Sequence, residues 1–176
     1  MFNKIFGVIF LRDSFKPGKV TVAGHHAALP YRTSYVEWLG TSQIACRKEV
    51  FKSFRFDENL EKYSTYAFYE DLDFTYRVSR KYKLLLNSEL KAIHVHSSTS
   101  VKNAFNVNFT KILNHYYLVR KHEFSKMAFW WSTIGLLLAH VILLLLKPSK
   151  VKLHGLRGLI EGIKKITKGG RLLCGK

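Results

Sequence analysis

Residues 68–97, FYEDLDFTYRVSRKYKLLLNSELKAIHVHS, bring acids and histidines together in a chain that otherwise carries mostly lysine and arginine. In the first half of this stretch apolar residues recur at helical spacing, and acids precede bases, which complements the helix dipole. Two short apolar runs follow at 83–87 and 91–96, and they predict strands. The stretch therefore predicts one helix followed by two strands. The acids at the start of the helix are Glu70, Asp71 and Asp73.

This acidic cluster has two interpretations. At a helix N-terminus each carboxylate stabilises the dipole by on the order of 0.3–1 kcal/mol, which requires no further function. Alternatively, a carboxylate that stays ionised there is a general base, which takes a proton from an attacking hydroxyl. Asp71 and Asp73 also have the D-x-D spacing that can bind a metal–diphosphate, although so short a pattern is not specific by itself.

The histidines His94 and His96 alternate along the second predicted strand and so point to the same face. Two imidazoles at this spacing can chelate a metal ion. His25 and His26 are candidates for further ligands by residue type alone. The alternative is that His94 and His96 are ordinary residues at the end of a strand.

The chain has 176 residues, of which 47% are hydrophobic, enough for one folded domain. Its net charge of +17 is uneven: residues 1–100 hold 15 basic and 10 acidic side chains, and residues 101–176 hold 14 and 2. The second part is therefore typical of a surface that faces a polyanion such as anionic lipid. Because the basic residues surround an apolar segment rather than an aromatic-lined groove, we expect no nucleic-acid partner.

Residues 128–146, AFWWSTIGLLLAHVILLLL, contain no Asp, Glu, Lys or Arg. This length is close to the roughly 20 residues that cross a bilayer, and tryptophans near one end favour the membrane interface. We expect a transmembrane or membrane-embedded helix here, after a helical linker at 101–127; a buried core helix is the alternative. The tail at 147–176 predicts a basic amphipathic helix, which either lies on an anionic leaflet or packs against the protein.

Five features occur in a fixed order between residues 36 and 97. They are Gly40 after a strand, Arg47-Lys48-Glu49-Val50-Phe51 on a short helix, Phe56-Asp57-Glu58, Glu70-Asp71-Leu72-Asp73 followed by Arg77, and Ala92 with His96. This order resembles the C-terminal part of the catalytic domain of family 2 glycosyltransferases, the inverting GT-A type. The departures concern loops: Phe54-Arg55, Tyr82 and Asn87-Ser88 stand where the family often has Gly, Gly and Pro.

The resemblance implies roles for the matched residues. Asp71 would be the catalytic base that deprotonates the acceptor hydroxyl, supported by Glu70. His96 would help to hold a divalent metal, Mg²⁺ or Mn²⁺, on the nucleotide diphosphate. The acceptor or donor pocket would include Trp38, Gly40, Asp73 and Arg77.

The resemblance also implies a fold. Residues 1–100 would be the C-terminal part of an α/β, Rossmann-like GT-A domain, followed by the membrane helix and the amphipathic tail. Enzymes of this family bind the nucleotide with a preceding half that carries its own D-x-D. Here only 35 residues precede Val36, and they contain a single acid, Asp13. We therefore expect a partial domain that lacks its nucleotide-binding half, which a separate chain would have to supply.

Two functional hypotheses follow. The first is a piece of a membrane-associated glycosyltransferase, inactive alone, that passes a sugar from a nucleotide-sugar to a lipid-linked or polysaccharide acceptor. Basic residues flank the apolar segment, so we expect it at the cell membrane with its catalytic part facing the cytoplasm. The second is a non-catalytic membrane-anchored scaffold or interaction protein with a lipid-binding tail. Asp71→Asn separates them, because only an enzyme would lose turnover.

Overall fold

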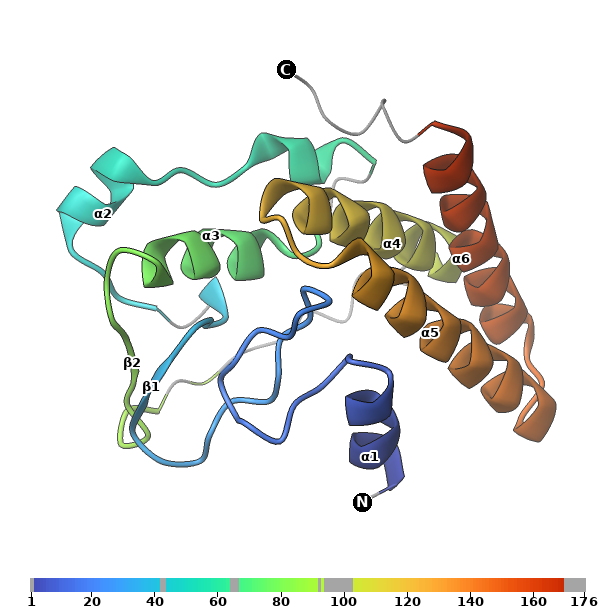
Figure 1. Ribbon diagram of the computed structural model, residues 1–176, viewed down its shortest axis with the longest axis horizontal. Helices are drawn as coiled ribbons and strands as arrows, with labels where there is room; N and C mark the ends of the chain where they lie inside the picture. Colours follow the sequence, from blue (N-terminus) through green and yellow to red (C-terminus); the bar gives the residue numbers. More distant parts are fainter. Residues whose placement is uncertain (1, 42–43, 64–66, 92, 94–102, 170–176) are drawn as a thin grey trace.

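The computed structural model describes residues 2–41, 44–63, 67–91, 93 and 103–169, and helices dominate it (Figure 1). The helices are α1 (Phe2–Ile9), α2 (Lys48–Ser53), α3 (Glu70–Ser79), α4 (Ala104–Lys121), α5 (Lys126–Leu146) and α6 (Lys150–Lys168), with a short 3-10 helix, η2, at Glu58–Glu61. Two three-residue strands, β1 (Ser34–Val36) and β2 (Leu84–Leu86), pair antiparallel, and Tyr35 lies opposite Leu85.

This architecture shows that the predicted α/β GT-A domain is wrong. In the described part of the chain the only sheet is the β1–β2 pair, and no Rossmann-like sheet is present. The apolar run at 83–87 does contain a strand, but it is short and its partner is antiparallel. A parallel sheet needs longer strands joined by helical crossovers and covered on both faces. The second predicted strand, 91–96, lies largely outside the described residues.

Helix α4 is the centre of the larger core, although its segment was expected to be a linker. It packs along α6, and α5 contacts both helices (Figure 1). The long helices bury their apolar faces against one another because each presents an apolar stripe that water disfavours. The buried side chains of this core are Ile112, Leu113, Tyr116, Val119, Phe129, Leu159 and Ile166.

Helix α6 approaches α4 closely because its buried face contains glycine. A Cβ at Gly158 would lie 2.2 Å from the carbonyl oxygen of Phe105, so a larger residue does not fit without moving a helix. Leu159 and Ile166 are buried on the same face. The tail thus packs against the protein, one of its two predicted alternatives, and leaves basic residues exposed: Arg157, Lys164, Lys165 and Lys168.

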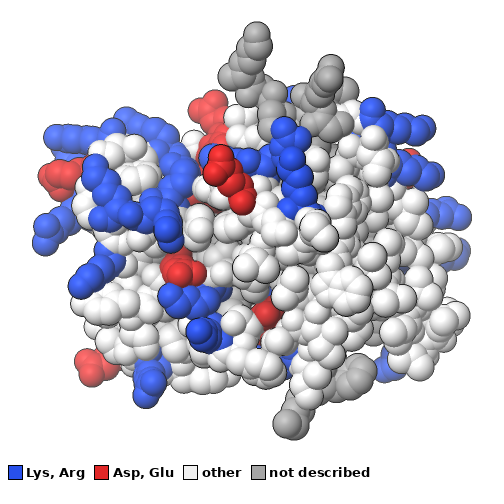
Figure 2. Space-filling view, viewed as in Figure 1, with Lys and Arg blue, Asp and Glu red and all other residues white. Residues whose placement is uncertain are grey.

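Helix α5 has one face toward the protein in its first half, whereas residues 141–146 are exposed on nearly all sides. Near its N-terminus Trp131 packs on Phe10, after α1, with ring centroids 5.2 Å apart. The outward face carries an apolar stripe whose side chains are 41–77% exposed: Trp131, Ile134, Leu138, Val141, Ile142 and Leu145. Figure 2 shows an uncharged surface over α5 and basic side chains along the outer edge of α6. By length and composition α5 can span a membrane.

Helix α3 joins a smaller lobe to this helical core. Its residues Phe74 and Val78 pack with Val50 of α2, while Leu72 packs with Leu118 of α4. The helix predicted in the first half of residues 68–97 is therefore confirmed as α3, and its first turn lies between the two cores.

Candidate functional site

The first turn of α3 is held against the segment that follows β1. The Thr75 hydroxyl donates to the carbonyl oxygen of Asp71 at 2.7 Å, and its oxygen accepts from the N–H of Leu39 at 3.1 Å. Gly40 faces the Asp71 carboxylate, since a Cβ at Gly40 would lie 4.0 Å from Oδ2. The structure therefore brings Asp71 and Gly40 together.

Trp38 lies in the same segment and contacts a second titratable group. Its indole N–H donates to the carbonyl oxygen of Ala27 at 2.8 Å, and its ring packs on His26 with centroids 4.2 Å apart. Burial lowers the pKa of His26 below its ordinary value, and the negative charge of Asp71 opposes this effect. We call the group Trp38, Gly40, Asp71 and His26 the Asp71 site.

Asp71 itself is partly exposed at the N-terminus of α3. Its Oδ1 accepts from the N–H of Leu72 at 2.7 Å, which leaves Oδ2 directed toward Gly40. The neighbouring Glu70 is also partly exposed, and burial raises its pKa, with the charges of Asp71 and Glu61 adding to the rise. A carboxylate at a positive helix terminus, open on one side, can accept a proton from a hydroxyl bound over Gly40.

Asp73 and Arg77, which were predicted to line the pocket, lie in a buried ion cluster. Arg77 donates from Nε and Nη2 to Oδ2 of Asp73 at 2.9 and 2.7 Å. Lys121 and His122 at the end of α4 both reach Oδ1 at 2.8 Å. Burial of Asp73 raises its pKa, but hydrogen bonds from His122, Arg77 and Lys121 outweigh burial and hold the pKa below its ordinary value.

The same cluster extends to Asp57 of the F-D-E motif. Its Oδ2 accepts from the Tyr117 hydroxyl at 2.7 Å and pairs with Lys121, while Oδ1 accepts from the N–H of Asn59 and caps η2. Asp57 and Asp73 thus fix η2 and α3 on the C-terminal end of α4. These bonds hold both carboxylates in the ion cluster and not at the Asp71 site.

The predicted metal ligands do not form a site in the described part of the structure. His94 and His96 lie outside it. The Nε2 of His25 is 3.2 Å from the Ser132 hydroxyl oxygen, and His26 packs on Trp38. Among described residues no group of three His, Cys, Asp or Glu could hold a metal ion. The expected Mg²⁺ or Mn²⁺ therefore stays a prediction, and we assign no step to a metal.

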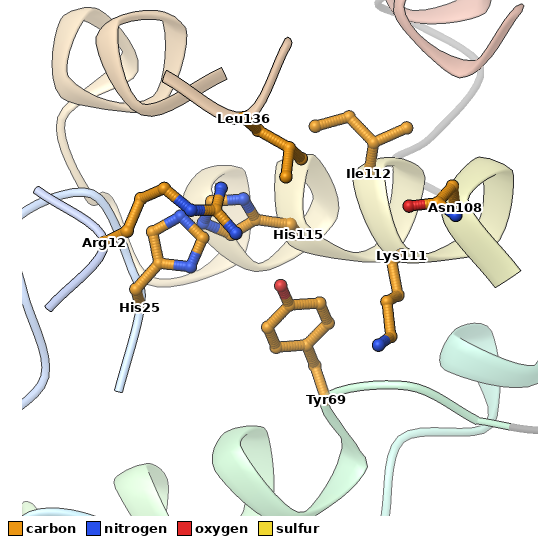
Figure 3. Close-up of a pocket in the computed structure, with 8 residues that line it drawn as sticks. All are labelled: Arg12, His25, Tyr69, Asn108, Lys111, Ile112, His115 and Leu136. Atoms are coloured by element: carbon orange, nitrogen blue, oxygen red, sulfur yellow. The ribbon is translucent and has the colours of Figure 1, made fainter. Parts of the chain in front are cut away.

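Sequence reasoning missed a polar cavity of about 130 Å³ next to Tyr69, the residue before α3 (Figure 3). Its side chains come from the N-terminal segment, α4, α5 and Tyr69, so no local motif marks it. The available signals were the unusual His25-His26 pair and the position of Tyr69 beside the acidic cluster. The cavity is lined by Arg12, His25, Tyr69, Asn108, Lys111, Ile112, His115 and Leu136.

No family model, curated protein or solved structure matches this chain. The resemblance to family 2 glycosyltransferases therefore rests on the order of motifs in the sequence alone, and it stays a prediction together with its functional consequences.

Proposed function

We propose that this chain supplies the acceptor side of a membrane-associated glycosyltransferase, in which Asp71 takes the proton from the acceptor hydroxyl. One observation carries the proposal. The two aspartates of the E-D-x-D motif have different environments: Asp73 is fully buried in ion pairs, whereas Asp71 is partly exposed opposite Gly40. A glycine there leaves the backbone open for a ligand to approach the carboxylate.

The reaction would be a single displacement. The acceptor oxygen attacks the anomeric carbon of the donor sugar while its proton passes to Asp71, and the bond to the nucleotide diphosphate breaks with its electron pair going to the phosphate. Positioned general bases contribute about 10²–10⁴-fold to such steps. The proposal requires no nucleotide-binding sheet in this chain, because a separate polypeptide would bind the nucleotide-sugar.

The apolar stripe of α5 supports membrane attachment and a lipid-linked or polysaccharide acceptor. In the first half of α5 the opposite face packs against the protein, and in the last turns Leu143 and Leu146 are exposed as well, which adds apolar surface. Such a helix is stabilised when its exposed side enters the acyl region, by roughly 25 cal/mol per Å² of apolar surface buried. Helix α4 contacts α5 and, through Leu118, the base of α3. We propose that attachment holds the Asp71 site at the cytoplasmic surface of the cell membrane.

The test is reconstitution. The purified chain is combined with candidate proteins that bind nucleotide-sugars, in lipid vesicles containing a polyprenyl-phosphate-linked acceptor, and release of UDP or dTDP is measured. We expect Asp71→Asn to reduce release by about 100-fold or more. Glu89→Gln, at an exposed acid that follows β2, is the matched control and should retain activity. Full activity of a folded Asp71→Asn protein contradicts the proposal, as does the absence of release from every pairing.

The second candidate is a non-catalytic membrane-anchored interaction protein. The exposed lysines of α6 and the apolar stripe of α5 favour it, because basic and apolar surface together can bind anionic lipid without any active site. In that case Asp71→Asn would leave vesicle binding and partner binding unchanged, and no pairing would release nucleotide.

A further inference from the structure

The cavity next to Tyr69 is positively charged. Arg12 and Lys111 contribute cationic side chains to its wall, and none of its eight lining residues is acidic. In the described part of the chain Arg12 forms no ion pair with a carboxylate. Arg12 is partly buried, and this burial lowers its pKa. A cation that is partly removed from water and has no acidic partner is stabilised when an anion compensates its charge.

Tyr69 adds a hydroxyl donor held in an unusual backbone conformation. Its φ is 73°, in the left-handed region that bulky residues rarely adopt. The ring stacks on His115 with centroids 5.5 Å apart, and Figure 3 shows the hydroxyl directed into the cavity, toward Arg12 and the two histidines. Backbone strain of this kind persists where the surrounding structure fixes a side chain in place, and it is concentrated at ligand sites.

The two histidines in the wall are neutral at pH 7. His115 donates from Nε2 to the carbonyl oxygen of Ala23 at 2.6 Å, and burial lowers its pKa to about 3. Burial also lowers the pKa of His25, and the neighbouring His115 and Arg12 lower it further. The positive charge of the cavity therefore comes from Arg12 and Lys111.

The size and the remaining wall indicate the kind of anion. A volume of about 130 Å³ is roughly ten times what one water molecule needs, and it accommodates a phosphoryl group. A guanidinium binds two oxygens of a phosphate at once, and the Tyr69 hydroxyl can donate to a third. Ile112 of α4 and Leu136 of α5 make part of the wall apolar, beside the helix that carries the apolar stripe.

We propose that this cavity binds a phosphoryl group through Arg12 and the Tyr69 hydroxyl. The inference rests on the proposed function and deepens it. The cavity would hold the phosphate of a lipid-linked acceptor at Tyr69, two residues before Asp71. The same chemistry would bind free phosphate, and the experiment separates the two sources.

Binding is measured by isothermal titration calorimetry on the full chain in nonionic detergent, at constant ionic strength. The probes are inorganic phosphate, farnesyl phosphate and uncharged farnesol. We expect Arg12→Gln to weaken phosphate binding about tenfold or more, because a charge-assisted bidentate contact is lost. Lys16→Gln, an exposed lysine on the same segment, is the matched control and should bind normally. Tyr69→Phe removes only the hydroxyl, and it should weaken binding severalfold even if Arg12→Gln fails to fold.

Tighter binding of farnesyl phosphate than of inorganic phosphate identifies a lipid headgroup as the ligand, and binding of inorganic phosphate alone identifies free phosphate. The proposal is overturned if neither binds, if farnesol binds as well as farnesyl phosphate, or if Arg12→Gln and Tyr69→Phe both bind normally. Binding and nucleotide release are independent measurements. Failure of phosphate binding with Asp71-dependent release intact removes only the cavity assignment, and the converse removes only the transferase.

Discussion

Replacing Asp73 by Asn tests whether the second aspartate of the E-D-x-D motif is structural. The substitution keeps the side-chain shape but removes the charge, and it places an amide N–H₂ group among the donors of Arg77, Lys121 and His122. Because the Asp73 side chain is 0% exposed, water cannot reach this position to solvate the donors that lose their anionic partner. We expect the folded protein to lose stability while Asp71→Asn, two positions away, remains nearly neutral.

The magnitude follows from the surroundings of each carboxylate. Removing one partner of a buried ion pair costs about 3–5 kcal/mol, since the remaining charge is left unpaired. Arg77 and Lys121 are each 23% exposed, and Lys121 keeps its contact with Asp57, so the expected loss is near the lower end, about 3 kcal/mol. Asp71 interacts mainly with its own helix terminus, and its loss should cost less than about 1 kcal/mol.

The free energy of unfolding is measured by urea titration in nonionic detergent, followed by tryptophan fluorescence and far-UV circular dichroism. The pKa of Asp73 is lowered by folding, so its contribution is complete above the unfolded value of about 3.9 and is lost as pH falls through the folded value. The difference between wild type and Asp73→Asn should therefore shrink below about pH 4. Equal losses for Asp71→Asn and Asp73→Asn at neutral pH would refute this reasoning.

Three further predictions concern packing, membrane binding and pH. Gly158→Ala should destabilise the protein by about 2–3 kcal/mol, since the new methyl meets the carbonyl oxygen of Phe105; an unchanged urea midpoint would contradict the α4–α6 contact. Leu145→Glu should reduce flotation with anionic vesicles about tenfold, whereas Ser53→Glu on exposed α2 should not; equal effects would exclude α5 as the membrane contact. Between about pH 6 and 4 His115 is protonated in the unfolded state but not in the folded state, so the free energy of unfolding decreases as the pH is lowered. His115→Gln should make this slope shallower by about 1.4 kcal/mol per pH unit. An identical slope would show that His115 titrates normally.

Local periodicity predicted most of the elements correctly. The helix from the acidic cluster is present as α3, the run at 83–87 contains β2, and the apolar segment at 128–146 lies within α5. These elements depend on the spacing of neighbouring residues, which a single sequence shows directly. The α/β fold class was wrong because it required strands to find parallel partners, and the partner of β2 is the antiparallel β1.

The candidate site was predictable only in part. Asp71 and Gly40 lie together, and the resemblance gave Asp71 and Asp73 different roles, but no sequence pattern showed that Asp73 is buried in an ion cluster. Their difference arises from α4, whose Lys121 and His122 are some fifty positions away and reach only one of the two carboxylates. Arg12 and Tyr69 were missed for the same reason, because a cavity wall assembled from distant segments leaves no local signal.

The sequence by itself determined the helices, the apolar stripe of α5 and the basic charge of the tail, since each follows from which residue types recur at a given spacing. Only the tertiary structure decided which acid is buried, that Arg12 has no ion pair among the described residues, and that α4 is the core rather than a linker. Burial and pairing are properties of contacts between segments far apart in the chain. The free energy of a charge depends on those contacts much more than on its neighbours in sequence.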